Sequence, residues 1–333
     1  MELLTPEYYH DFHCLAAACP DSCCKEWEVE IDADTACRYR ALPGLLGDRL
    51  RAVLREEDGN TVMTITDGRC PMWRQDGLCQ IQAQLGHDAL CQVCREFPRL
   101  RHDYGDFVEL GLELSCPEAA RLIFTATGHK MIAETVPGGD APEYDQDAMA
   151  ILRRSREELL SFLEQEAYGV QESLAIMLLY SHAVQAELDG GEVAVLDPES
   201  LLTSAKQYAQ QRGNIETVFS FFSRLEILTP QWQDLLQTPQ SGAWESSLRK
   251  LTQYGIQRYW LQAVSDYDLI CRVKMMIIAC IVVNAIGGDP VQTSQLFSKE
   301  IENNSANVEA ILDGAYTAPA FTDTHLLSLL LNS

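Results

Sequence analysis

Apolar and polar residues alternate with a period of two in three short stretches before residue 130, which predicts strands there. Between these stretches, apolar residues recur every three or four positions, which predicts helices. The predicted strands are 29–32, 61–66 and 106–114, and the predicted helices are 34–54 (broken near Pro43-Gly44), 80–94 and 118–131.

The later part of the chain follows the helical spacing almost throughout. The predicted helices are 148–165, 170–188, 198–211, 215–228, 244–264 and 266–286. Asp197-Pro198 and Thr229-Pro230 each predict a helix start, in which a capping side chain precedes a proline at the first helical position. The most apolar stretch, 275–286, is shorter than the roughly 20 residues of a membrane-spanning helix, so we expect a buried core helix.

A change of pattern separates these two parts. Residues 134–147 (ETVPGGDAPEYDQD) are rich in glycine and proline and have no apolar period, which is typical of a linker. We therefore predict a mainly α protein with a cysteine-rich, metal-binding N-terminal domain at 1–133 that contains a few short strands. The linker at 134–147 would lead to an all-α domain at 148–333.

Composition narrows the functional classes. The chain has 333 residues, 47% of them hydrophobic, and a net charge of -24, so we expect a folded protein with an acidic surface. Such a charge repels phosphate backbones and anionic lipids, which argues against nucleic acid and membrane as partners. This negative charge would attract a lysine-rich protein surface. The alternative is that it only keeps the protein soluble. Residues 1–10 lack the pattern of a secretory signal, so we expect a cytoplasmic protein.

The cysteines are concentrated in the first part of the chain. Of twelve cysteines, only Cys271 and Cys280 lie beyond residue 116, in apolar helical stretches where a thiol is most often a small buried hydrophobe. In a chain of this size without an export signal, clustered thiols are better explained as metal ligands than as disulfides. Buried structural thiols are the alternative.

The thiols form two clusters of nine candidate metal ligands in all: Cys14, Cys19, Cys23, Cys24, Cys70, Cys79, Cys91, Cys94 and Cys116. Adjacent cysteines point in different directions, so Cys23 and Cys24 cannot readily serve one metal atom. Structural zinc sites usually show paired two-residue spacings, and only Cys91-x2-Cys94 has one. The irregular spacing favours an iron–sulfur cluster, with zinc as the alternative.

Other residues near the clusters are weaker candidates. Arginines 69, 95 and 99 would lower thiol pKa values and offset cluster charge. Histidines 13, 87 and 102 could be ligands or bases, although a solvated or hydrogen-bonded structural role is the more common one. Trp27 and Trp73 would cover the metal region. The sequence contains no glycine-rich nucleotide-binding loop. It also lacks the C-x3-C-x2-C triplet that is typical of radical S-adenosylmethionine enzymes.

Several segments resemble the flagellin lysine N-methylase family. They are C-x4-C-x3-CC from Cys14, CPMW from Cys70, LCQIQAQLG from Leu78, CREFPR from Cys94, SCPEAARLI from Ser115 and FSKEIENNSANVEAIL from Phe297. The cysteine core is also similar to a wider group of zinc- or iron-chelating domains. The chain stops soon after Leu331, without the extended tail that the resemblance implies, which bears on substrate docking more than on the metal site.

This resemblance implies a protein-lysine methyltransferase that transfers methyl groups from S-adenosylmethionine to flagellin. It also implies that the enzyme carries an iron–sulfur cluster, which we expect to be of the 4Fe-4S type. The resemblance narrows the ligands to the eight candidate cysteines that match the positions of the family's cysteines, Cys14, Cys19, Cys23, Cys24, Cys70, Cys79, Cys94 and Cys116, and sets Cys91 apart. A lysine amine attacks a sulfonium methyl only when it is neutral, so the enzyme needs a desolvated pocket or a base. His102 and Tyr104 are weak candidates for that role, and Arg95 and Arg99 are weak candidates for binding the cofactor.

Two alternatives stay open at this point: a non-enzymatic protein that stores, delivers or senses iron or zinc, and an interaction scaffold in which metal only stabilises the first domain. The number of metal centres, the position of the S-adenosylmethionine pocket, the choice between polar and radical transfer and the oligomeric state do not follow from the sequence.

Overall fold

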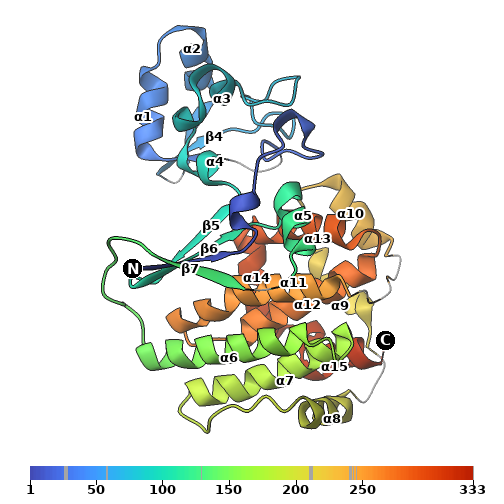
Figure 1. Cartoon of the computed structure of the whole chain (residues 1–333). Helices are drawn as coiled ribbons and strands as arrows, with labels where there is room; N and C mark the ends of the chain where they lie inside the picture. Colours follow the sequence, from blue (N-terminus) through green and yellow to red (C-terminus); the bar gives the residue numbers. More distant parts are fainter. Residues whose placement is uncertain are drawn as a thin grey trace.

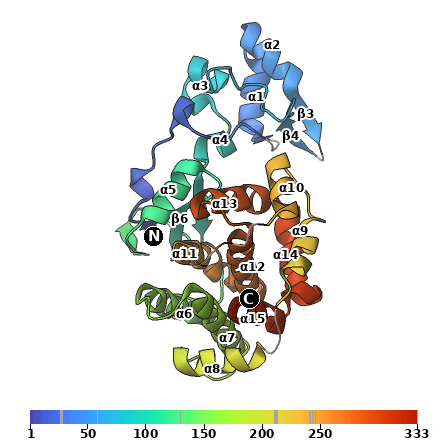
Figure 2. The ribbon, with the colours of Figure 1, turned by 90° about the vertical axis from the view of Figure 1, so that its right-hand side faces the viewer.

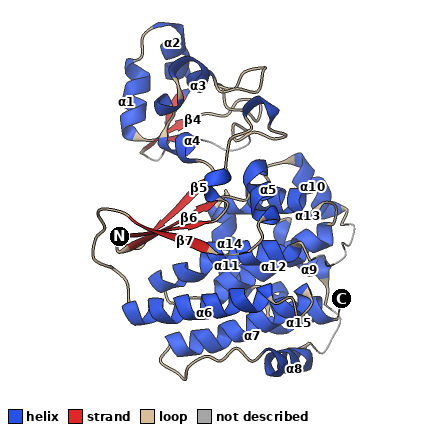
Figure 3. Cartoon of the chain, in the orientation of Figure 1, coloured by secondary structure: helices blue, strands red, loops and turns tan. Residues whose placement is uncertain are grey.

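The computed structural model describes residues 1–25, 29–57, 59–128, 130–209, 213–239, 242, 244 and 246–332. These residues form fifteen α-helices and seven strands, arranged as a small head, a four-stranded sheet and a larger helical body (Figures 1 and 3). The mainly helical fold class with a few short strands is therefore confirmed.

The head is built on its own hydrophobic core. Its elements are β2 (Val29–Ile31), α1 (Ala33–Ala41), α2 (Gly44–Val53), β3 (Leu54–Glu57), β4 (Asn60–Met63), α3 (Gln80–Leu85) and α4 (Gln92–Glu96). The three strands form an antiparallel sheet in the order β2-β4-β3. Leu50 and Met72 are fully buried in this core, which also contains Cys70 and Cys91. The predicted break near Pro43 separates α1 from α2, because Gly44 adopts a positive φ of 80°.

A second sheet lies between the head and the body (Figure 1). Its strand order is β5-β6-β1-β7, from β1 (Glu2–Pro6), β5 (Arg99–Asp103), β6 (Phe107–Leu112) and β7 (Met131–Thr135). β1 runs parallel to β6, with Glu2 opposite Phe107, and antiparallel to β7. The chain leaves β1, forms the head, and returns through β5, so the head is attached at the start of β5.

The helical body packs against the other side of this sheet. Its helices are α6 (Gln146–Glu164), α7 (Val170–Leu188), α8 (Pro198–Tyr208), α9 (Ile215–Phe222), α10 (Pro230–Gln237), α11 (Leu248–Tyr259), α12 (Ile270–Ile286), α13 (Pro290–Phe297), α14 (Ser305–Thr317) and α15 (Asp323–Leu331). α12 is buried along most of its length and contacts α7, α11 and α14, as Figure 2 shows from the side. This confirms the predicted core helix. None of the described helices is long and apolar enough to cross a bilayer.

Both predicted helix starts are present. Asp197 accepts a hydrogen bond from Ser200 N–H (3.2 Å) at the start of α8, and Thr229 Oγ1 accepts one from Trp232 N–H (3.1 Å) at the start of α10. For α10, only this start was predicted, and no helix range was given. A side chain that satisfies a free N–H at a helix terminus is worth about 1 kcal/mol.

The predicted helices differ from the structure in four main places, of which the first is the helix expected at 215–228, which is α9 and ends at Phe222. The helix expected at 80–94 is two short helices, because Gly86 adopts φ +87° and ends α3. The helix expected at 118–131 is α5 (Pro117–Thr125), and the chain then becomes strand β7. The helix expected at 244–264 begins only at Leu248 and continues as a 3-10 helix after Tyr259.

The strands β1, β3, β5 and β7 were not predicted. β7 lies across the predicted boundary at 133, and Phe107 and Leu114 belong to the same hydrophobic core as the body helices. The sheet therefore packs with the body, whereas residues 29–94 of the head have a separate core. The domain boundaries themselves remain a prediction.

Candidate thiol-rich site

Seven cysteines line one cavity of about 320 Å³ at the junction of the head, the sheet and α5. They are Cys14, Cys19, Cys23, Cys24, Cys79, Cys94 and Cys116. Cys70 and Cys91 are buried directly behind this lining, each in contact with a cysteine of it. The structure therefore brings together all eight candidate ligands and Cys91, from segments up to about a hundred residues apart.

Helix starts position three of these thiols. Cys79, Cys91 and Cys116 are the residues directly before α3, α4 and α5. Cys116 lies next to the backbone N–H groups of Glu118 and Ala119, the first free donors of α5, which lower its pKa by less than burial raises it. Such donors favour the thiolate form. The proline after Cys116 fits this geometry, because it occupies the first helical position.

Thiol–thiol contacts connect the head cysteines. The Cys24 thiol is in hydrogen-bond contact with Cys23 and Cys70, and this contact lowers the pKa of Cys70 to about 7 and lowers the pKa of Cys23. The pKa of Cys24 is raised for the same reason. A similar contact with Cys94 lowers the pKa of Cys91. When sulfurs lie this close, the proton lost by one thiol affects the pKa of its neighbour, and such neighbouring thiols can act together as the thiolate ligands of one site.

A second group of thiols lies at the α5 side of the cavity. Burial raises the pKa of Cys19, and it raises the pKa of Cys116 to about 11. Cys14 and Cys19 add to the shift at Cys116 through like charge. The thiols thus surround the cavity as two neighbouring groups rather than as one compact set.

This arrangement bears on the kind of metal. Among the described residues, no three side chains of His, Cys, Asp or Glu converge on a point as ligands of one ion do. A tetrahedral zinc site with Zn–S bonds of about 2.3 Å needs sulfurs only about 3.8 Å apart. A metal centre, its type and its ligands remain predictions.

Charged side chains share the cavity with the thiols. Arg95 and Arg99, the candidate cofactor-binding residues, both line it, and Arg99 also lies over the Phe12 ring at 5.2 Å. Lys299 reaches the cavity from the body, where its ammonium is 2.9 Å from an Asp21 carboxylate oxygen. Burial opposes ionisation of Asp21, but the hydrogen bond and charge of Lys299 outweigh it and lower the pKa of Asp21.

Sequence analysis missed both members of this pair. Asp21 lies in the cysteine loop between Cys19 and Cys23, and Lys299 lies in the segment FSKEIE that carries the C-terminal resemblance. Those two locations are the only signal that the sequence offers. Proximity of the two side chains depends on the docking of the head segment against the body.

The two candidate bases lie elsewhere. His102 and Tyr104 line a second, more open cavity of about 850 Å³ at the far end of β5. β5 runs from Arg99, which lines the thiol cavity, to Asp103, which lines the second cavity, a span of about 13 Å at roughly 3.3 Å per residue. Burial and the Arg258 charge lower the pKa of His102, and Tyr104 stacks on Phe107 with ring centroids 4.6 Å apart. Neither residue lines the thiol cavity.

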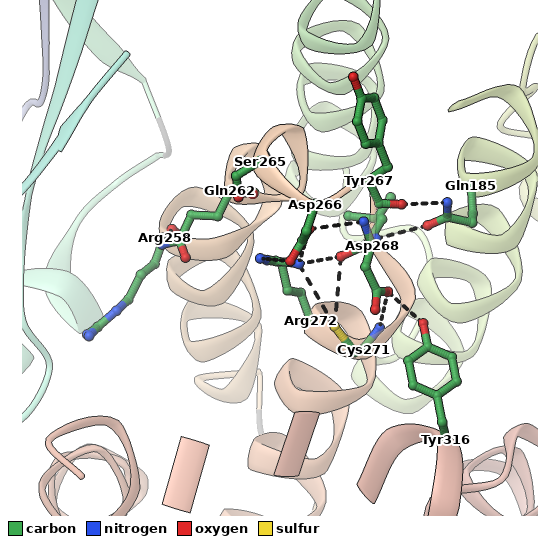
Figure 4. Close-up of polar contacts among 11 residues, drawn as sticks. Gln185, Arg258, Gln262, Ser265, Asp266, Tyr267, Asp268, Cys271, Arg272 and Tyr316 are labelled. Carbon is green, nitrogen blue, oxygen red and sulfur yellow. Dashed lines mark hydrogen bonds and ion pairs between the residues drawn. The ribbon is translucent and has the colours of Figure 1, made fainter. Parts of the chain in front are cut away.

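The loop between the 3-10 helix after α11 and helix α12 forms one wall of this second cavity (Figure 4). Gln185 of α7 donates a hydrogen bond to the Tyr267 carbonyl (2.8 Å) and accepts one from Leu269 N–H (2.9 Å). Asp266 pairs with Arg272 at 2.8 Å. These contacts hold the wall to α7 and α12, so this cavity is a feature of the body rather than of the cysteine head.

The remaining candidates are spread more widely. His87 lines the thiol cavity, whereas the ring nitrogen Nδ1 of His13 lies 2.9 Å from the Asp11 carbonyl oxygen. Trp73 lies under Arg69, whose guanidinium is 4.1 Å from the ring centroid, and Trp27 is outside the described residues.

Three cysteines lie outside the thiol site. Cys37 is exposed on α1. Cys271 and Cys280 are buried in α12, as expected for core thiols.

The fold and the site define a class of protein in which a cysteine-rich head joins a helical body around a thiol-lined cavity. Comparison with known proteins identifies the family. The chain is 32% identical over 125 residues to a flagellar biosynthetic protein FliU of Salmonella muenchen, covering 35% of this chain and 74% of that protein. It is 32% identical over 125 residues to proteins named lysine-N-methylase from Salmonella choleraesuis and Salmonella typhimurium, of which it covers 31%.

The chain belongs to the flagellin lysine N-methylase family. It spans about three quarters of FliU and about a third of the two lysine-N-methylases that it matches. No family profile matches the chain, and no solved structure matches it.

Proposed function

We propose that this protein is an S-adenosylmethionine-dependent methyltransferase that modifies lysine side chains of flagellin, with its cofactors held at the thiol cavity. The observation that carries the proposal is the cavity itself, because it combines seven cysteine thiols with charged groups of both signs. The names of the relatives, lysine-N-methylase and flagellar biosynthetic protein, supply the reaction and the substrate.

The charged lining suits a zwitterionic cofactor. S-adenosylmethionine carries an α-carboxylate, an α-amino group and a sulfonium. Arg95 and Arg99 offer donors for a carboxylate, and Glu118 offers an acceptor for the amino group. The apolar side chains of Phe12, Leu15, Leu78, Leu90 and Phe97 line the remainder of the cavity and would cover the less polar part of the molecule.

Methyl transfer at this site would be a direct displacement. The lone pair of a neutral lysine amine forms the new N–C bond while the methyl–sulfur bond breaks, and the sulfonium leaves as a neutral thioether. Before attack, the lysine ammonium must lose a proton, because its ordinary pKa is near 10.4. His87 lines the cavity and is our candidate for accepting it, in place of His102 and Tyr104.

An iron–sulfur cluster is the group that the thiols would hold. Cys79 and Cys116 lie at helix starts and Cys24 and Cys94 lie in the head; all four line the cavity, and three of them would bind the cluster. Bound there, it would supply an iron atom with an open position able to orient a carboxylate and an amine. We place the protein in the cytoplasm, where thiols remain reduced.

Two arginines of one strand make the test specific. Arg99 and Arg101 are two residues apart on β5, but Arg99 lines the thiol cavity and Arg101 lines the second cavity. The protein is purified without oxygen, analysed for iron, sulfide and zinc, and titrated with methyl-labelled S-adenosylmethionine. Arg99→Met should weaken binding roughly tenfold, the loss expected for one hydrogen bond between charged groups. Arg101→Met should bind as the wild type does.

Incubation with flagellin and mass spectrometry of its lysines then tests transfer. Methylated lysines that depend on S-adenosylmethionine support the proposal. A protein that contains only zinc and binds no S-adenosylmethionine would refute it in favour of a structural metal domain. If Arg101→Met weakens binding and Arg99→Met does not, the cofactor lies in the second cavity.

A further inference from the structure

Lys299 is the one lysine of the helical body that lines the thiol cavity among the described residues. It lies in a π-helical turn, Ser298–Glu302, which continues α13 and is closed by the hydrogen bond from Asn303 N–H to the Ser298 carbonyl (3.2 Å). Single π-helical turns inside helical segments are rare and are frequent at functional sites. The turn changes the direction in which successive side chains leave the helix.

Three charged side chains of this turn are buried, and each meets a different part of the fold. Glu300 accepts a hydrogen bond from Leu228 N–H (2.8 Å) just before α10. Glu302 pairs with Arg258 of α11 (3.3 Å). The side chain of Lys299, 4% exposed, instead leaves the body and pairs with Asp21 at 2.9 Å. Lys299 is therefore the charge of this turn that contacts the cysteine region.

Asp21 connects that lysine to the thiols. It lies between Cys19 and Cys23 in the first cysteine loop, and Lys25 is a second, longer partner at 3.4 Å. Gln295, one turn before Lys299, donates to Asp21 (3.4 Å) and to the carbonyl of Ser115 (2.6 Å), the residue before Cys116. The end of α13 thus contacts both cysteine segments on the α5 side of the cavity.

We propose that Lys299 is a positioning residue, which fixes the Cys19–Cys24 loop through Asp21 so that its thiols face the cavity together with Cys116. The inference deepens the proposed function, since it names the contact through which the body assembles the thiol site. It follows from geometry: a loop with several thiols is attached to the π-helical turn by an ion pair whose lysine is buried and whose aspartate is half-buried. Without that pair, the loop loses its strongest described tie to the body.

The first test measures loop order without any metal. Apo-protein is treated with iodoacetamide, and the alkylation rate of each cysteine is followed by mass spectrometry. Lys299→Met should speed alkylation of half-buried Cys19 and Cys24 by about tenfold, because hindered thiols react through opening of the local structure. Exposed Cys37 on α1 is the internal control and should not change.

The second test measures metal affinity. The apo-protein is titrated with Co²⁺ without oxygen, and the thiolate-to-metal absorption band is followed against a competing chelator. Lys299→Met should weaken binding at least tenfold, Lys299→Arg should stay within about threefold of the wild type, and the charge swap Asp21→Lys with Lys299→Asp should restore most of the affinity. Lys206→Met, which removes an exposed lysine paired with Glu172, is the control.

A double-mutant cycle with Asp21→Asn decides whether the two residues act as a pair, since their effects should then not add. Additive effects, or Lys299→Met with unchanged Cys19 and Cys24 reactivity and unchanged Co²⁺ affinity, would overturn the proposal. A swap variant that stays as weak as Lys299→Met while its circular dichroism is native would also overturn it. If the wild type methylates no flagellin, the proposed function fails, but both readouts still test Lys299.

Discussion

The buried ion pair between Glu109 and Arg156 attaches the sheet to the body, and its removal offers a quantitative test of the structure. Glu109 lies on β6 and Arg156 on α6, and two hydrogen bonds of 2.6 and 2.9 Å join the carboxylate to the guanidinium. The side chains are 5% and 12% exposed. β6 directly follows β5, the strand at which the chain returns from the head. This pair therefore helps to hold the thiol cavity against the body.

Arg156→Met leaves the Glu109 carboxylate buried without its partner. Two hydrogen bonds to charged groups are lost, each worth about 1.5–3 kcal/mol. Breaking a buried pair by removing one partner typically costs about 3–5 kcal/mol, which is the loss we expect in the free energy of unfolding at pH 7.5. The matched control is Arg101→Met. It breaks an exposed pair with Asp103 in the same sheet and should cost less than about 1 kcal/mol.

The pH dependence of the loss identifies its cause. In the variant, the unpaired and buried Glu109 should have a folded-state pKa above the ordinary value of about 4.3. The penalty is then complete above that raised pKa, and it disappears as the pH falls and the folded carboxyl takes up a proton. Urea unfolding at pH 7.5 and pH 5 should show a smaller difference between variant and wild type at pH 5. A loss below about 1 kcal/mol, or one equal at both pH values, would refute the reasoning.

Two further predictions concern the thiols and the acid stability of the body. Cys94→Ser should lower the metal content of the anaerobically purified protein, and Cys271→Ser should not; elemental analysis compares them, and equal losses would contradict the division into cavity and core thiols. Burial opposes ionisation of Asp323, but close contacts with His182 and Lys274, each at 2.9 Å, outweigh it and lower its pKa from 3.8 to about 2. The contribution of Asp323 to the free energy of unfolding should therefore be complete above about pH 4 and lost as the pH falls towards 2. Asp323→Asn should make urea unfolding less sensitive to acid. The effect is limited because the side chain is 37% exposed.

The hydrophobic pattern predicted the long helices well because each buries one continuous face. α7 matches the predicted range 170–188, and α6 differs from its predicted range by a residue or two at each end. The strands of the central sheet were largely missed for a physical reason. β1 is stabilised by pairing with β6 and β7, which come from segments more than a hundred residues away, and β7 pairs with β1 alone among the described strands. Five residues such as Met131–Thr135 carry too little local pattern to reveal that pairing.

The thiols of the site were predictable because cysteine carries its chemistry in its residue type and clusters along the sequence. Their geometry was not. The single helix expected at 80–94 would have placed Cys79 and Cys91 at one helix start and near one helix end. Gly86 instead divides this segment, so that each thiol precedes a separate short helix. The positive φ of one glycine therefore determines how two of the thiols face the cavity.

The charged residues of the cavity were harder to predict than the thiols, because their role depends on partners from distant segments. In FSKEIE, the three charges would ordinarily indicate a solvated helix face. The structure buries all three, since Asp21, the start of α10 and Arg258 each satisfy one of them. A buried charge persists only where such a partner is in place. The thiol cavity thus includes a residue of the body, and an account of the cysteine head alone would omit the lysine that meets its first loop.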